Sequence, residues 1–221
     1  MSDPVGDRGA DRAAEREKLM LAALPHVAFD GWTTTALSHG ASDAGLDETD
    51  AERLFPGGPA ELVRAFADWA DQCMVGRMAA SDIETPRTRD RIRLAVRVRI
   101  EAVAPYREAV RQGLAHFTFP ANAASGLKTL YRTVDAMWYA AGDRTANFGF
   151  YTKRGLLAGV FSSTLVYWLE DASEGNEATW AFLDRRIDDV IRIQRLRGRL
   201  ERVAGGLPDP FRLFSAFAPR R

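Results

Sequence analysis

The side chains that most often carry enzymatic chemistry are few in this sequence and lie far apart. Its three histidines, His26, His39 and His116, have no metal-ligand spacing relative to one another or to carboxylate pairs. No HExxH, GxSxG or phosphate-loop glycine pattern occurs. The single cysteine, Cys73, has no neighbouring Cys or His with which to hold a metal. The sequence therefore predicts a protein with no catalytic residues, no cofactor and no metal.

The densest group of aromatic, small and charged side chains lies in residues 135–161, DAMWYAAGDRTANFGFYTKRGLLAGVF. Its pattern predicts a corner between two helices near Gly142. In one interpretation Trp138 and Tyr151 pack this corner and the nearby charges pair with one another. In the other, the aromatic and charged side chains form a docking surface, since such residues are enriched at interaction hot spots. The second interpretation assigns partner binding to Asp135, Trp138, Tyr139, Tyr151 and Arg154.

Helices must hold these residues in place, and apolar residues recur at helical spacing along most of the chain. Three short helices within residues 11–56, with Gly31 and Gly45 at the corners, are the outline of a helix-turn-helix domain. A plain three-helix bundle would show the same pattern. Longer helices are predicted over 59–81, 86–103, 106–117, 121–141, 148–170 and 176–204. No convincing strand pattern occurs, so the predicted class is all-α.

Composition and charge set the expected organisation. With 46% hydrophobic residues in 221, the chain is long and apolar enough for a real core. Lys plus Arg and Asp plus Glu each number 30, so net charge gives no reason to expect attraction to phosphate backbones or anionic lipids. We expect a disordered tail over 1–10, the helix-turn-helix-like domain over 11–56, a larger helical domain over 57–204 and an amphipathic segment over 205–221.

The charge of the front domain argues against DNA binding. A helix that reads DNA needs hydrogen-bond donors for base edges and cations for phosphates. Residues 30–55 instead hold six acids and one base, Arg53. The acids are Asp30, Asp43, Asp47, Glu48, Asp50 and Glu52. The sequence therefore predicts a domain kept as a scaffold, with no nucleic-acid partner.

The segment 135–161 closely resembles the signature DxMW(Y/H)xAGD…F.WYT(K/R)R of the lipid-binding accessory proteins of ubiquinone biosynthesis, the COQ-nine family. Phe150 departs from it, where the signature has Trp. The resemblance covers roughly residues 11–200 and includes the Phe-Pro-Gly-Gly of 55–58. The matching residues are Asp135, Met137, Trp138, Tyr139, Ala141, Gly142, Asp143, Phe148, Tyr151, Thr152, Lys153 and Arg154, continuing through Thr164, Asp171, Trp180, Phe182, Leu183 and Arg186.

This resemblance implies a TetR-like fold that has left DNA regulation and holds an isoprenoid lipid or quinone. It also implies association with the di-iron hydroxylase that acts on demethoxyubiquinone. The surface around Trp138 and Tyr139 would then meet either this partner or the quinone head group. A homodimer through the last two long helices is implied too, and a monomer in light scattering would contradict it. The residues expected to line an apolar lipid cavity are Leu127, Leu130, Val134, Leu157, Val160, Phe161 and Leu165.

The C-terminal end combines apolar and basic side chains. Gly205 and Gly206 break the last helix, and residues 185–202 just before hold seven arginines against three acids. An interfacial helix on an anionic bilayer fits this pattern and the family resemblance implies one; a tail folded onto its own domain or a dimer mate is the alternative. The expected membrane residues are Leu207, Phe211, Leu213, Phe214 and Phe217.

Together these patterns predict a lipid-binding accessory protein of ubiquinone synthesis that presents a quinone intermediate to the hydroxylase. No apolar run approaches the roughly 20 residues that span a bilayer, and the acidic start MSDPVGD has no signal-peptide pattern. We therefore expect a bacterial cytoplasmic location, peripheral to the inner membrane. The rivals are a TetR-type ligand-responsive transcriptional regulator, which a salt-sensitive, sequence-specific mobility shift would support, and a structural subunit with a filled core.

Overall fold

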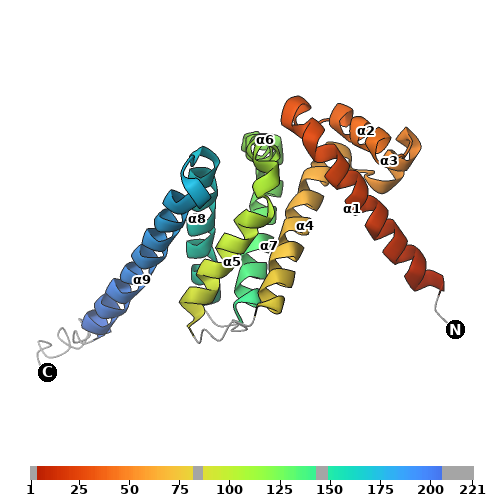
Figure 1. The fold of residues 1–221 in the computed structure, drawn as a ribbon. Helices are drawn as coiled ribbons and strands as arrows, with labels where there is room; N and C mark the ends of the chain where they lie inside the picture. Colours follow the sequence, from red (N-terminus) through yellow and green to blue (C-terminus); the bar gives the residue numbers. More distant parts are fainter. Residues whose placement is uncertain (1–3, 82–86, 143–148, 206–221) are drawn as a thin grey trace, which may run out of the picture.

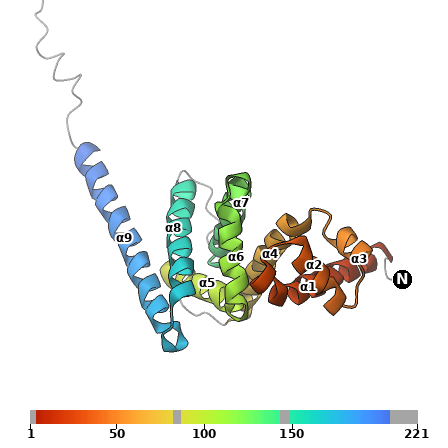
Figure 2. The same ribbon diagram turned by 90° about the horizontal axis from the view of Figure 1, so that it is seen from above.

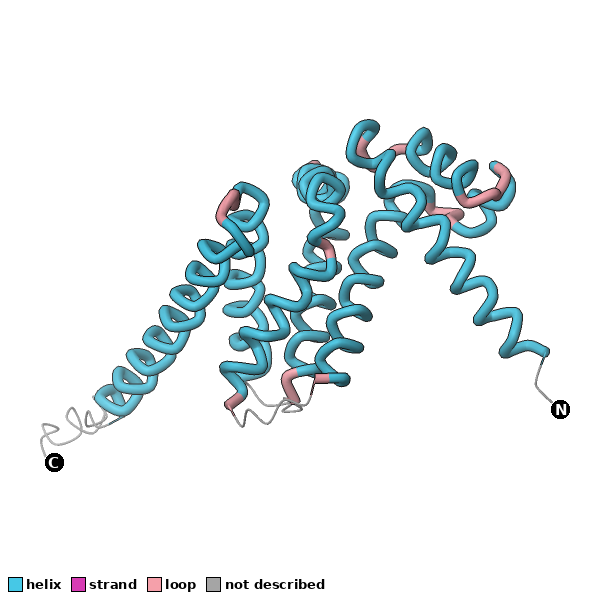
Figure 3. Tube along the Cα trace, viewed as in Figure 1, coloured by secondary structure: helices cyan, strands magenta, loops and turns pink. Residues whose placement is uncertain are grey.

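The computed structural model describes residues 4–81, 87–142 and 149–205, with side chains for 9–81, 87–142 and 152–192. Within these ranges every regular element is helical and no strand occurs, which confirms the predicted all-α class (Figure 3). The α-helices are α1 (Pro4–Asp30), α2 (Thr34–Asp43), α3 (Glu48–Leu54), α4 (Gly58–Ala80), α5 (Thr88–Ala102), α6 (Arg107–Thr118), α7 (Pro120–Ala140), α8 (Gly149–Glu170) and α9 (Glu177–Gly205). Two short 3₁₀ turns, Ala104–Tyr106 and Glu174–Asn176, precede α6 and α9.

The corners of the front three helices follow directly from the sequence. Gly31 and Gly45 both adopt positive φ, 69° and 72°, a conformation that glycine reaches without a Cβ penalty. The Thr33 hydroxyl accepts a hydrogen bond from Ala36 N and caps α2, and Asp47 caps α3 in the same way. The first helix begins at Pro4 rather than near Asp11, since proline is tolerated in a first helical turn.

Helices α1 and α2 cross with almost no space between their backbones. A Cβ added at Gly40 would lie 2.6 Å from both Cα and Cβ of Ala23 and 2.7 Å from its backbone N. Real Cβ atoms do not approach a backbone so closely, so Gly40 is the residue that lets α2 lie on α1. This crossing fixes the angle of the front helices.

The front helices share one continuous core with the rest of the chain. The buried apolar side chains, from Leu19 of α1 to Ile187 of α9, form a single cluster in contact. The indole N–H of Trp32, just before α2, donates to the Ala109 carbonyl of α6 at 3.1 Å. Figure 1 shows α4 descending from the front helices, with α5, α6 and α7 beside it. The predicted domain boundaries stay a prediction.

Helices α8 and α9 lie on the side of the molecule opposite the front helices (Figures 1 and 2). In the view from above, α9 diverges from α8 toward its C-terminal end (Figure 2). Tyr167 of α8 stacks on Phe182 of α9, with ring centroids 4.5 Å apart. The start of α9 is thereby held against α8, while its later turns extend away.

The corner between α8 and α9 depends on one buried carboxylate, Asp171. Its oxygens accept hydrogen bonds from Thr179 N at 2.8 Å, from the Thr179 hydroxyl at 2.5 Å and from Ser173 N at 2.8 Å. Burial would raise the pKa of Asp171, but these hydrogen bonds outweigh it and hold the pKa well below its usual range. The carboxylate thus satisfies free amides before and within the first turn of α9.

We expect Asp171→Ala to lower the free energy of unfolding by about 1–2 kcal/mol at pH 7, because a charged helix cap is lost. The pKa of Asp171 is lower in the folded than in the unfolded chain, so its contribution is full above the unfolded pKa of about 4 and declines as pH falls below it. Urea unfolding of both proteins from pH 7 to pH 3 checks this. A stability difference that grows on acidification would contradict it.

Candidate functional site

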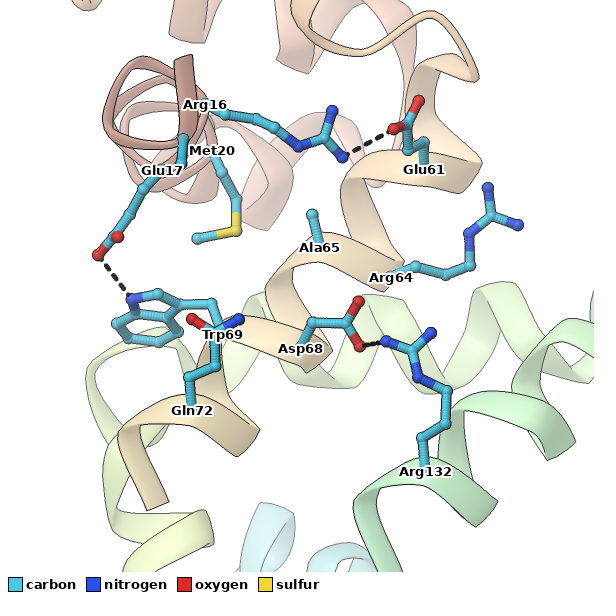
Figure 4. Close-up of a pocket in the computed structure, with 11 residues that line it drawn as sticks. Arg16, Glu17, Met20, Glu61, Arg64, Ala65, Asp68, Trp69, Gln72 and Arg132 are labelled. Carbon is cyan, nitrogen blue, oxygen red and sulfur yellow. Dashed lines mark hydrogen bonds and ion pairs between the residues drawn. The ribbon is translucent and has the colours of Figure 1, made fainter. Parts of the chain in front are cut away.

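Two pockets of similar size open between the described helices, and their linings differ in kind. The first has a volume of about 450 Å³ and lies between α1 and α4, with Arg132 of α7 at its edge (Figure 4). Charged side chains dominate its lining. The second, of about 490 Å³, lies among α4, α5, α6, α7 and α8 and is lined mainly by apolar side chains.

The charged pocket is neutralised by its own side chains. Arg16 Nη2 donates to Glu61 Oε1 at 2.7 Å, and Arg132 pairs with Asp68 (Figure 4). Burial alone would raise the pKa of Glu61. Hydrogen bonds from the Gly57 amide and from Arg16 outweigh this effect, so the pKa of Glu61 lies below its usual range. These ion pairs join α1 and α7 to α4, so we assign this pocket a structural role.

The apolar pocket is open toward solvent on one side. Among its lining residues, Leu127 of α7 is 69% exposed and Val166 of α8 is 55% exposed. Exposed apolar side chains that border an apolar groove are typical of ligand-binding or interaction sites. The opposite wall contains buried residues of α4 and α5, including Phe66 and Arg99. We therefore place the apolar mouth of the pocket at Leu127 of α7 and Val166 of α8, and its inner end at the buried residues of α4 and α5.

The structure brings together some of the predicted lipid residues and separates others from them. Four of the seven line the apolar pocket, namely Leu127, Leu130, Phe161 and Leu165. The other three, Val134, Leu157 and Val160, are buried in the general core and do not line it. The apolar residues of one helix face drift slowly around the helix axis along its length. Residues of the same face therefore meet different neighbours. Lipid binding by the four lining residues stays a prediction.

A buried polar cluster on the inner wall was not predicted from the sequence. Arg99 Nε donates to Asp71 Oδ1 at 2.6 Å, and the Thr133 hydroxyl donates to Asp71 Oδ2 at 2.9 Å. All three residues are less than 9% exposed. Burial, partly offset by Arg99 and Thr133, raises the pKa of Asp71 above its usual range. The sequence held one signal for this cluster. Arg99 lies three residues after Val96 and so on the apolar face of α5, where a charged side chain needs a buried partner.

The predicted partner-binding residues gather at the end of α7 and the start of α8. Arg154 is buried and donates to Asp135 Oδ1 from Nε at 2.8 Å and from Nη2 at 2.5 Å. The Lys153 ammonium lies 5.7 Å from the centroid of the Trp138 ring, and Tyr139 is 62% exposed. The side chain of Tyr151 lies outside the described residues. These contacts show packing at the corner, and docking there stays a prediction.

The predicted membrane residues of the C-terminal segment, from Leu207 to Phe217, also lie outside the described residues. In the part of the chain that is described, no helix combines the length and apolarity needed to cross a bilayer.

Comparison with known proteins places the chain in a family. The COQ9 family model matches residues 123–194. "Ubiquinone biosynthesis protein COQ9, mitochondrial" of Drosophila melanogaster is 34% identical over 194 residues, which are 85% of this chain and 59% of that protein. "Ubiquinone biosynthesis protein COQ9-B, mitochondrial" of Xenopus laevis is 30% identical over 200 residues, covering 86% of this chain and 68% of that protein. The chain belongs to the COQ9 family. The predicted resemblance is thereby confirmed.

COQ9 relatives also correct one expectation. The chain spans 59% of the Drosophila protein and 63% of the human COQ9, to which it is 30% identical. The predicted bacterial cytoplasmic location, peripheral to the inner membrane, is wrong: these relatives are all named as mitochondrial proteins. That expectation depended on two absences, of a bilayer-spanning apolar run and of a signal-peptide pattern in the first residues, and neither absence identifies a compartment.

The fold of this COQ9 family member is TetR-like, as predicted. A crystal structure of a TetR transcriptional regulator from Nitrosomonas europaea superimposes with a TM-score of 0.64, at 20% identity, over 78% of this chain and 95% of the regulator. This likeness concerns the fold alone, because fold does not by itself carry function.

Proposed function

We propose that this chain acts without catalysis in ubiquinone biosynthesis, binding an isoprenoid quinone intermediate in the apolar pocket among α4, α5, α6, α7 and α8. The observation that carries the proposal is this pocket, with its apolar mouth at Leu127 and Val166, in a member of the COQ9 family. Its volume of about 490 Å³ lies within the range of small-molecule sites, about 300–1,000 Å³.

Burial of the ligand's hydrocarbon supplies the driving force for binding. Each CH₂ group removed from water contributes about 0.8 kcal/mol, so a few isoprene units offset the entropy lost on association. The lining offers contacts suited to such a chain, including Phe117 of α6 and Leu165 of α8. A polar metabolite of the same size would leave its hydrogen-bonding groups unpaired against these walls.

The test is native mass spectrometry with lipid extraction of the protein purified from its own host. We expect a co-purifying polyprenyl quinone in the wild type and loss of most of it in Leu127→Glu, because a carboxylate at the mouth must be desolvated when an apolar chain enters. Phe29→Glu is the matched control, since Phe29 is 90% exposed on α1 and does not line the pocket. A wild-type protein that carries no lipid and shows no saturable quinone binding would contradict the proposal and favour a structural subunit.

We further propose that the surface around Tyr139 on α7 docks onto the di-iron hydroxylase that acts on demethoxyubiquinone. The proposal is supported by the exposure of Tyr139, which lies one helical turn after Asp135, the partner of Arg154 in an ion pair. Tyrosine is among the residues enriched at interaction hot spots.

We expect Tyr139→Ala to weaken binding of the purified hydroxylase about tenfold or more in a surface plasmon resonance measurement. Tyr131→Ala is the control, because Tyr131 is also an exposed aromatic residue of α7, 42% exposed, outside the predicted docking surface. An equal loss of affinity in Tyr139→Ala and Tyr131→Ala would contradict docking at Tyr139.

The charge of α3 favours this accessory role over a transcriptional regulator. Glu48 and Asp50 lie in its first turn, and Arg53 pairs with both Glu15 and Asp50. The one base of residues 30–55 is therefore already neutralised, and a helix that binds DNA needs free cations for phosphates. The homodimer through α8 and α9 stays a proposal; Figure 2 shows both helices at the outer end of the molecule.

A further inference from the structure

The inner wall of the apolar pocket carries an arginine whose donors are only partly used. Arg99 of α5 is 7% exposed and lines the pocket. Its Nε donates to Asp71 Oδ1 at 2.6 Å, and its Nη2 donates to the Ala67 carbonyl at 3.2 Å. Nη1 donates to no residue in the part of the chain that the structure describes. A guanidinium has five N–H groups in a fixed plane, so donors remain directed away from Asp71.

An acceptor that reaches the unused N–H groups of a largely buried cation gains a charge-assisted hydrogen bond. The lining around Arg99 is otherwise mostly apolar and includes Phe161, whose ring centroid lies 6.0 Å from the guanidinium carbon. Thr129, 8% exposed, lines the same pocket, and its hydroxyl donates to no described residue. A hydroxyl can donate or accept, whereas a guanidinium can only donate, so the charged group that the lining offers to a ligand is a donor.

We propose that the ligand of this pocket carries a neutral hydrogen-bond-accepting oxygen, such as a quinone or ketone carbonyl, which Arg99 Nη1 binds at the inner end. The inference rests on the proposed function and deepens it by fixing the ligand's chemistry and direction. The oxygen-bearing end enters first, and the hydrocarbon tail leads back to Leu127 and Val166 at the mouth. The head group is then shielded from water until the ligand is released.

The neutrality of the acceptor follows from the charges around it. The positive charge of Arg99 is already balanced by Asp71, which also accepts from Thr133 at 2.9 Å. No second cation lines this pocket among the described residues. A carboxylate or phosphate on the ligand would add an unbalanced negative charge close to Asp71 in a site of low polarity, and the repulsion would cost more than the hydrogen bond returns.

The experiment compares three probes with similar farnesyl chains on the delipidated full chain, by isothermal titration calorimetry in detergent-free buffer. They are farnesylacetone, with one ketone oxygen, the hydrocarbon farnesene and farnesoic acid at pH 8, where it is ionised. We expect the ketone to bind about tenfold or more tightly than farnesene, the factor that a hydrogen bond to a charged group supplies. Farnesoate should bind no more tightly than the ketone.

The variant that tests the residue is the double substitution Asp71→Leu with Arg99→Met, because removing one partner alone leaves a buried charge unpaired. It should lose the preference for the ketone over farnesene. Arg97→Met is the control, since Arg97 also lies on α5 but is half exposed and pairs with Glu101; it should keep the preference.

The outcomes separate the two proposals. Equal binding of ketone and hydrocarbon by the wild type, or a ketone preference that survives the double substitution, overturns the role of Arg99 while lipid binding stands. Tighter binding of farnesoate than of the ketone overturns the neutral acceptor. Failure of all three probes to bind overturns the proposed function and this inference with it.

Discussion

Replacing Asp71 with alanine is expected to lower the free energy of unfolding by about 3–5 kcal/mol, the cost typical of breaking a buried ion pair from one side. The reason is that Arg99, 7% exposed, would keep its charge without the carboxylate that accepts its Nε hydrogen bond at 2.6 Å. Thr133 would lose its acceptor as well. Urea unfolding followed by circular dichroism measures the change.

The double substitution Asp71→Leu with Arg99→Met is the control for this prediction. It removes both charges and fills the space with apolar groups, so we expect it to recover most of the stability lost in Asp71→Ala. A single variant that costs less than about 1 kcal/mol would show that water or another group replaces the lost carboxylate, and the account of Asp71 and Arg99 as a buried ion pair would be wrong.

Gly40→Ala is expected to destabilise the protein by about 1–3 kcal/mol, against the usual sign for a helical glycine. Alanine normally stabilises an exposed helix position by about 0.5–1 kcal/mol relative to glycine. At Gly40 the added Cβ would lie 2.6 Å from the backbone Cα of Ala23, which no side-chain rotation relieves. Helices α1 and α2 must then move apart.

Gly76→Ala in α4 is the matched control. An added Cβ at Gly76 meets nothing within 4 Å, so this substitution should show the ordinary gain of about 0.5–1 kcal/mol. Thermal unfolding of both variants decides the matter through the sign of the change in Tm. If Gly40→Ala also raises Tm, the close crossing of α1 and α2 does not limit the packing of the front helices.

The results for Gly40→Ala and Gly76→Ala would bear on the role of the front helices, α1 to α3, in a chain whose α3 is too acidic to bind DNA readily. The front helices share the core with the rest of the molecule, and Trp32 donates to the Ala109 carbonyl of α6. Gly113 of α6, which lines the apolar pocket, lies beside the indole, since an added Cβ would come 3.4 Å from Trp32 Nε1. The front helices therefore support the wall of the candidate site.

The sequence by itself determined the helices, their corners and the family. Gly31, Gly45 and the cap at Thr33 act within a few residues of themselves, so local chemistry is enough to predict them. The signature of residues 135–161 led to the COQ9 family because its side chains recur at fixed spacing along one segment.

Only the tertiary structure decided which apolar residues line a pocket and which fill the core. Leu127 and Val134 belong to one predicted stripe, yet Leu127 lies at the pocket mouth and Val134 is fully buried. Helical periodicity gives the direction in which a residue faces but not the helix that it meets. The pairing of Arg99 with Asp71, 28 residues earlier, depends on how α5 packs on α4, and no local pattern contains that information.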